Sequence, residues 1–119
     1  MYRIGIDCVE ISRIENTLKN ERFQTRFGSA ELDEIKSRGE KPVNFASSFA
    51  AKEAFSKAVG TGIRGFSLKD VQLIHDELGK PMLLLSDELK EKYKNMSFDI
   101  SITHTDSLVI AAVIAESED

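Results

Sequence analysis

Residues 49–57 read FAAKEAFSK, a run of apolar residues interrupted by a narrow charged stripe. At helical spacing Glu53 and Lys57 lie one turn apart on one face, with Lys52 and Ser56 beside them. A helix that is apolar over most of its circumference is usually buried, and buried charges need a partner, a metal ion or a polar cleft. We therefore treat the stripe as a candidate functional site. The alternative is an exposed Glu–Lys pair on a helix surface.

The composition is that of an ordinary globular domain. The chain has 119 residues, 41% hydrophobic and 30% charged, which predicts a single domain over residues 1–119 with one modest core. Its net charge of -4 argues against nonspecific binding of nucleic acid. Cys8 is the single cysteine, so no intrachain disulfide can form. We see no targeting or membrane-spanning segment, and we expect a cytoplasmic protein without a membrane partner.

The N-terminal segment predicts a strand. Residues 3–8 alternate, with Ile4, Ile6 and Cys8 on one face and Asp7 near the strand end on the other. We expect the apolar face to be the buried one, with Cys8 as a buried free thiol.

The rest of the chain carries helical patterns first and mainly strand patterns after residue 65. The last strand, residues 108–115, is continuously apolar and is therefore expected at the centre of a sheet. The other expected elements are a helix to about residue 20, a helix over 29–38 with Ser29 as N-cap, the striped helix over 45–59, strands over 70–75 and 82–85, a helix capped by Ser86, and a strand over 98–103.

Two carboxylates, Asp7 and Glu53, are candidates for a metal site. If the striped helix packs on the sheet, they would hold one Mg²⁺, which takes one or two carboxylates and accepts phosphate oxygens. Spacing alone does not bring them together. Lys57 would then neutralise phosphate charge. His104, at a strand end, is a hydrogen-bond donor to phosphate, an acid/base group or a structural residue. We interpret His75 as structural.

Three segments together resemble one family: residues 5–14 (GIDCVEISRI), residues 49–62 (FAAKEAFSKAVGTG) and residues 101–105 (SITHT). They are similar to the three motifs of bacterial holo-acyl-carrier-protein synthase, the short type of 4′-phosphopantetheinyl transferase. Their order and spacing match, as does the intervening Gly79-Lys80-Pro81. The resemblance implies an enzyme that moves the phosphopantetheine arm of coenzyme A onto a serine of apo acyl carrier protein and releases adenosine 3′,5′-bisphosphate.

The resemblance also implies an architecture and an assembly. The fold would be α+β, with a mainly antiparallel sheet packed against a long buried helix. The active form would be a homotrimer with its sites between neighbouring subunits.

Site residues follow from the resemblance by position. Asp7 and Glu53 match the Mg²⁺ ligands, and Lys57 matches a lysine that contacts the coenzyme A phosphates near the reacting centre, so these three are the expected catalytic residues. The residues expected to bind coenzyme A are Lys57, Gly60, Gly62, Pro81, His104 and Thr105. The residues expected to bind the acidic carrier protein are Arg13, Arg22 and Arg26. The proton acceptor for the carrier serine stays open between Glu53 and a metal-bound water.

One position departs from the family pattern. The residue before residues 49–54 is usually an arginine that helps bind the nucleotide phosphates, and here it is Ser48. Either Lys52 or another base compensates, or coenzyme A binds weakly. Two other functions therefore stay open: a binding module that keeps the fold without turnover, and a Mg²⁺-dependent hydrolase of the coenzyme A pyrophosphate.

Overall fold

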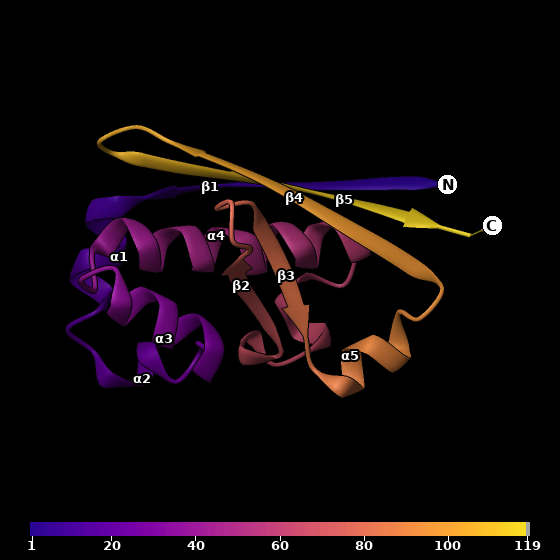
Figure 1. Ribbon diagram of the computed structural model, residues 1–119, viewed down its shortest axis with the longest axis horizontal. Coiled ribbons are helices and arrows are strands. Elements are labelled where there is room, and N and C mark those ends of the chain that lie inside the picture. Colours follow the sequence, from indigo (N-terminus) through magenta and orange to yellow (C-terminus); the bar gives the residue numbers. More distant parts are fainter. Residues whose placement is uncertain (119) are drawn as a thin grey trace.

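The computed structural model describes residues 1–118, and for Ile63 and Arg64 it describes the backbone only. A run of helices follows the first strand, and the remaining strands lie in the second half of the chain (Figure 1). In order they are β1 (Tyr2–Glu10), α1 (Ile11–Thr17), α2 (Glu21–Gln24), α3 (Ser29–Ser37), α4 (Pro42–Val59), the 3₁₀ turns η1 (Gly62–Gly65) and η2 (Leu68–Asp70), β2 (Val71–His75), β3 (Pro81–Leu85), α5 (Asp87–Lys92), β4 (Met96–His104) and β5 (Leu108–Ser117).

The strands form two antiparallel sheets. The larger sheet has the order β1-β5-β4, so the continuously apolar β5 is central, as predicted. Strands β2 and β3 form a separate hairpin. The larger sheet covers one side of α4, while α3 and the hairpin lie on its other side (Figure 1). This arrangement confirms the α+β fold with a mainly antiparallel sheet against a long buried helix. Across residues 1–118 we find no helix with the length and apolar character needed to cross a bilayer.

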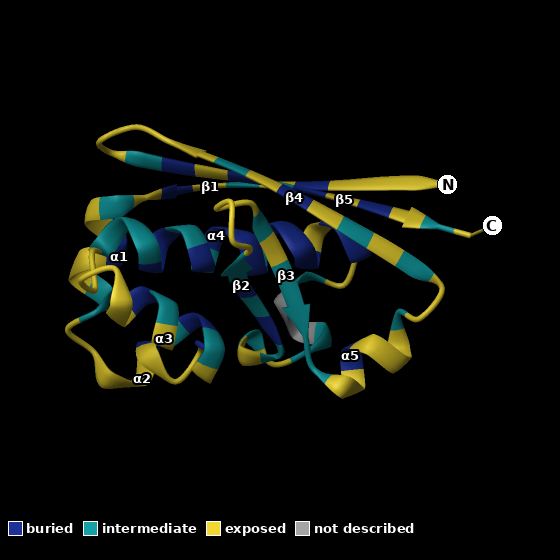
Figure 2. Ribbon diagram, in the orientation of Figure 1, coloured by how far each residue is buried: buried dark blue, intermediate teal, exposed yellow. Residues whose placement is uncertain are grey.

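Helix α4 begins three residues earlier than predicted. Pro42 occupies its first turn, where the missing N–H costs no hydrogen bond, and Gly60 ends it with a φ of 80°, a conformation that favours glycine. Most of the residues of α4 are buried (Figure 2). Aromatic clusters hold both halves of the helix, with ring centroids 5.0–6.1 Å apart: Phe45 and Phe49 pack with Phe23 and Phe27, and Phe55 packs with Phe66, Tyr93 and Phe98.

The buried face of β1 is the opposite of the one predicted. Ile4 and Ile6 are 71% and 58% exposed, and Cys8 is exposed too, so the expectation of a buried thiol was wrong. The reason is Gly5, which lies against α4: a Cβ there would overlap the Ala54 carbonyl oxygen and the Ala58 nitrogen. The helix therefore sits on the face that carries Gly5, and the isoleucines point away from it.

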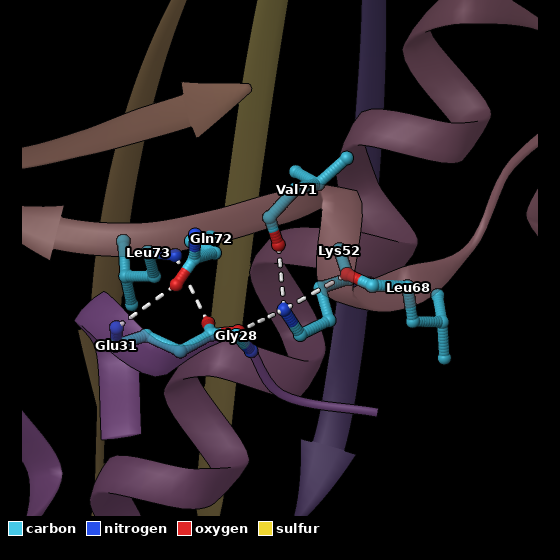
Figure 3. A network of polar contacts seen from close by, with 7 residues as sticks. All are labelled: Gly28, Glu31, Lys52, Leu68, Val71, Gln72 and Leu73. Atoms are coloured by element: carbon cyan, nitrogen blue, oxygen red, sulfur yellow. Dashed lines mark hydrogen bonds and ion pairs between the residues drawn. The ribbon is translucent and has the colours of Figure 1, made fainter. Parts of the chain in front are cut away.

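A buried ion pair joins α4 to the elements beneath it (Figure 3). The Lys52 ammonium is completely buried and donates to Glu31 Oε2 at 2.5 Å, to the Val71 carbonyl at 2.5 Å and to the Leu68 carbonyl at 3.0 Å. Its three donors are thus all used. Burial lowers the pKa of Lys52, and the Glu31 carboxylate opposes that shift by favouring the charged form.

Glu31, at the start of α3, completes the same network. Its carboxylate accepts from the Gly28 N–H at 2.7 Å and from the Leu73 N–H at 3.0 Å, and its own N–H donates to Gln72 Oε1 at 3.1 Å. Ser29 was predicted as the N-cap of this helix, and the N-cap is Gly28 instead, one residue earlier. The pair therefore ties α3, α4 and β2 together through charge-assisted hydrogen bonds.

The buried pair predicts a large stability difference between two similar substitutions. Glu31→Gln leaves the Lys52 ammonium without a counter-charge and should lower the free energy of unfolding by about 3 kcal/mol. Glu91→Gln removes the exposed partner of Lys94 and should change it by less than about 0.5 kcal/mol. Urea unfolding of both variants measures the two values. Equal small losses would contradict the role assigned to the buried pair.

Candidate active site

The structure brings Asp7 and Lys57 into contact. Lys57 Nζ donates to Asp7 Oδ1 at 3.0 Å and to the Ile6 carbonyl at 2.9 Å. The Asp7 side chain is 16% exposed and that of Lys57 is 52% exposed, so the carboxylate is sheltered while the ammonium remains accessible to a ligand. Because Gly5 lets α4 approach β1 so closely, residues 50 positions apart in sequence meet here.

Glu53 lies one turn before Lys57 and near Asp7. Burial raises the pKa of the Glu53 carboxyl above its ordinary value of 4.5, the negative charge of Asp7 raises it further, and the Lys57 ammonium offsets only part of the shift. A bound cation would stabilise the ionised form of Glu53 against both effects. The two candidates for a metal site are therefore close enough to interact, which spacing alone did not establish.

A groove extends from these carboxylates toward α1 and α2. Asp7, Glu53 and Phe49 line it together with Arg13 and Arg26. Arg26 also stacks over the Phe23 ring, with its guanidinium carbon 5.7 Å from the ring centroid. The groove thus combines acidic groups on the β1 and α4 side with guanidinium groups on the α1 and α2 side.

Arg22 differs from the other two predicted carrier-binding arginines. It is exposed on α2 but does not line the groove. Its backbone N–H donates to the Asn20 side chain, which caps α2.

The donor set of the groove fits magnesium better than zinc. Among the described residues no group of three or more His, Cys, Asp or Glu side chains could hold a metal ion. Structural and catalytic zinc sites need three or four protein ligands, mostly His and Cys. Magnesium commonly uses one or two carboxylates and completes its shell with water and phosphate oxygens. Asp7 and Glu53 match the second pattern.

A second hollow lies between α3, α4 and the β2–β3 hairpin. Pro81 and His104, both predicted to bind coenzyme A, line it together with Gly79 and Ser48. His104 is the last residue of β4, as expected, and its ring Nδ1 is 3.4 Å from the Thr105 carbonyl oxygen. The strand end, the hairpin turn and α4 therefore converge on one space.

The two hollows are separate within one chain, because they share no lining residue. Ser48 and Glu53 are five positions apart on α4, which places them about 140° apart around the helix axis. The predicted site residues thus form two clusters that face different sides of α4. The carboxylate cluster consists of Asp7, Glu53 and Lys57, and the hairpin cluster consists of Pro81 and His104.

Three predicted coenzyme A residues lie outside both hollows. Gly60 and Gly62 follow the end of α4 with φ values of 80° and 63°. Thr105 lies in the turn between β4 and β5, where its hydroxyl accepts from the N–H groups of Ser107 and Leu108 at 3.3 and 3.1 Å. Thr105 is the neighbour of His104 without lining its hollow, and Gly60 and Gly62 line neither hollow.

Sequence reasoning missed residues in the second hollow and misplaced one. Lys52 was considered as a replacement for the absent arginine at position 48, but it is fully buried against Glu31 and lines neither hollow. His75 contacts Glu34 through its ring Nδ1 at 3.0 Å, which agrees with a structural role, yet it also faces the hollow. Arg38 lines the same space and carried no signal in the sequence beyond its position at a helix end.

Comparison with known proteins identifies the family. Residues 3–113 match the family model described as the 4′-phosphopantetheinyl transferase superfamily. The chain belongs to this superfamily. The resemblance drawn from the three motifs is therefore confirmed.

Bacterial relatives agree over nearly the whole chain. The holo-[acyl-carrier-protein] synthase of Fusobacterium nucleatum is 40% identical over 116 residues, which cover 93% of this chain and 95% of the relative. The synthase of the same name from Clostridium botulinum is 44% identical over 117 residues, covering 95% of each.

Solved structures share the fold. The holo-[acyl-carrier-protein] synthase of Neisseria meningitidis superposes with a TM-score of 0.89 at 37% identity, covering 97% of this chain and 98% of that one. The Helicobacter pylori synthase, solved in complex with coenzyme A, gives a TM-score of 0.85 at 35% identity and covers 95% of this chain and 99% of that one. The superfamily and the α+β fold thus rest on both sequence and structure.

The raised pKa of Glu53 predicts a pH-dependent effect on stability. The folded state holds the Glu53 proton more tightly than the unfolded state does, so this group's contribution to stability is present at low pH and is lost as the pH rises through its raised pKa. Glu53→Gln should therefore unfold at a higher temperature than the parent at pH 7, and the gain should vanish below about pH 4.5. Thermal unfolding across this range measures it.

Glu15→Gln is the control for that experiment. Glu15 is exposed on α1, and its replacement should change stability by less than about 0.5 kcal/mol at either pH. A Glu53→Gln variant that loses stability at pH 7 would contradict the assignment.

Proposed function

We propose that this protein transfers the 4′-phosphopantetheine group of coenzyme A to a serine of apo acyl carrier protein, as a holo-acyl-carrier-protein synthase. The observation that carries the proposal is the meeting of Asp7, Glu53 and Lys57 in a member of the 4′-phosphopantetheinyl transferase superfamily. Relatives near 40% identity bear the name of this activity, and the solved relatives from Helicobacter pylori and Bacillus anthracis contain coenzyme A or its 3′,5′-ADP part.

Asp7 and Glu53 would hold a Mg²⁺ ion. Bound there, the ion would supply positive charge to the substrate pyrophosphate. The fit rests on the two neighbouring carboxylates and on the match of two carboxylates to the preferences of magnesium. Burial, and after it the charge of Asp7, raises the pKa of Glu53, so a cation bound there would favour the ionised carboxylate. Magnesium dependence is part of the proposal.

The reaction is a displacement at phosphorus. The serine oxygen of the carrier forms a new bond to the β-phosphorus of coenzyme A, the bond from that phosphorus to the bridging oxygen breaks, and adenosine 3′,5′-bisphosphate leaves with the electron pair. Lys57 is half exposed beside Asp7, so its ammonium can stabilise the negative charge of the leaving bisphosphate. The serine proton must pass to a base, for which Glu53 and a water molecule are the candidates.

A homotrimer is the assembly we propose. The carboxylate cluster and the hairpin cluster share no hollow within one chain, although the resemblance assigns both to the binding of a single coenzyme A molecule. A neighbouring copy that offers its hairpin face to the carboxylate face of the first would complete one site. Gly60 and Gly62, after the end of α4, and Thr105, next to His104, line neither hollow and would meet the same ligand in such an assembly.

The outer face of the larger sheet supplies a surface for that assembly. Ile4 and Ile6 of β1 lie beside Ile114 of β5, and all three are exposed. Large contiguous apolar surfaces on a soluble protein usually mark an interface. In register, Ile4 pairs with Ile114, which puts the two side chains on the same face.

The carrier protein would dock beside the carboxylates. Arg13 and Arg26 line the groove that contains Asp7 and Glu53, so an acidic partner bound there would present its serine to the site. Because the whole chain has a net charge of -4, recognition of an acidic partner requires such a local basic surface. Arg22, which is exposed on α2 and does not line the groove, would contact the partner only at the margin. We also propose that residues 1–119 form a single transferase domain that acts in the cytoplasm.

Transfer to a carrier protein tests the proposal directly. Incubation with coenzyme A, Mg²⁺ and apo acyl carrier protein should add one phosphopantetheine to the mass of the carrier, and Glu53→Gln should reduce the rate by about 100-fold or more because the metal loses a ligand. Mg²⁺ should also raise the unfolding temperature of the parent and not that of the variant. Bisphosphate released without carrier modification would instead indicate a hydrolase, and binding without turnover would indicate a binding module.

The trimer predicts that a charge on the outer sheet face abolishes assembly. Ile4→Glu should convert the parent trimer into a folded monomer and remove transfer activity, because each site would lose half of its residues. Lys90→Glu, at an exposed position on α5, should leave the trimer intact. Sedimentation velocity gives the number of chains per particle and circular dichroism checks the fold. A fully active monomer would exclude a shared site.

A further inference from the structure

The phosphate-binding arginine that the family usually has at position 48 is absent, and the expected substitute is not available. Ser48 is buried and lines the hairpin hollow. Lys52 is only four residues further along α4, but its ammonium is sealed inside the protein with all three donors used. A phosphate bound in this hollow would therefore need a cationic side chain from an element other than α4.

Arg38 is the residue placed to supply that charge. It is the single Arg or Lys among the described residues that line the hollow. It stands at the C-cap of α3, where its backbone N–H donates to the carbonyls of Glu34 and Ile35 at 3.1 and 3.2 Å. The residue is exposed, and its guanidinium makes no ion pair with any described side chain. An unpaired guanidinium retains its five donors for a ligand.

The acidic residues of the hollow do not cancel this charge. Glu31 is buried against the Lys52 ammonium. Glu34 is held by His75, accepting from its backbone N–H at 2.9 Å and contacting the ring Nδ1 at 3.0 Å. Since a carboxylate can only accept, that contact places the ring proton on Nδ1 of His75. Both carboxylates thus have partners of their own, whereas Arg38 has none.

We propose that Arg38 binds the 3′-phosphate of coenzyme A, in place of the arginine that α4 lacks. This inference rests on the proposed function, because it assigns one end of the same substrate. The pyrophosphate must reach Lys57 and the carboxylates, which lie outside the hollow of Arg38. The phosphate that Arg38 contacts is therefore the one at the far end of the ligand, on the adenosine. His104, which lines the same hollow, offers a further hydrogen-bonding group to it.

Calorimetric binding separates this contact from other roles of Arg38. Arg38→Gln should weaken the binding of adenosine 3′,5′-bisphosphate and of coenzyme A by about 10-fold to 100-fold, the cost of one charge-assisted contact. Binding of 3′-dephospho-coenzyme A should change by less than about 3-fold, because the lost partner is missing from that ligand. Lys41→Gln is the matched control, since Lys41 is exposed three residues away and does not line the hollow.

A second substitution tests the idea of replacement. Ser48→Arg, made in the Arg38→Gln background, should restore at least part of the lost affinity for the bisphosphate, since the new side chain would enter the same hollow. Thermal unfolding of each variant checks that the fold is retained. Equal losses with coenzyme A and its dephospho form, or no loss with either, would overturn the assignment of Arg38.

The outcome is distinguishable from failure of the proposed function. If the parent modifies the carrier and Arg38→Gln binds coenzyme A as tightly as the parent does, the inference fails and the function stands. If the parent binds the bisphosphate through Arg38 but never modifies a carrier, the function fails and the binding site stands. A parent that does not bind the bisphosphate at all overturns the inference.

Discussion

The buried contact between Lys52 and Glu31 sets the position of α4, and the rest of the molecule depends on that position. Three donors of one ammonium reach α3, the start of β2 and the turn before it, so the helix cannot rotate about its axis without leaving a charge unpaired inside the protein. Glu53, the next residue, is thereby turned about 100° away from the buried side and toward β1. A fully paired charge in the core thus orients a neighbouring charge that remains available for chemistry.

Much of this arrangement could be predicted from local patterns. The apolar run of residues 49–57 identified the buried helix, and the unbroken apolar run of β5 identified the central strand. Only the face of β5 toward α4 is buried in the single chain, since Ile110 and Ile114 on the outer face are exposed. Asp7 and Glu53 were proposed as a pair on the condition that helix and sheet pack together, and the structure satisfies that condition. The motifs and their order then predicted the superfamily, which the comparisons confirm.

Other features depend on partners distant in sequence and were missed. Alternation in β1 predicted two faces but not which one α4 would cover, and the isoleucines proved exposed because the glycine between them admits the helix. Lys52 was grouped with the functional stripe because helical spacing does not reveal that Glu31, 21 positions earlier, lies beneath it. Arg38 gave no pattern at all, since a surface arginine at a helix end acquires meaning only when a hollow forms in front of it.

The close approach at Gly5 has a consequence for how this enzyme family member can vary. The nearest atoms to the missing side chain are backbone atoms of Ala54 and Ala58, which a rotamer change cannot move aside. A methyl group at position 5 would therefore push the whole helix outward and carry Glu53 and Lys57 away from Asp7 as one rigid unit. The three side chains of the candidate site would be unchanged, but they would no longer be aligned with one another. Tolerance to mutation at this residue is thus limited by the spacing between two layers, although the residue itself has no functional group.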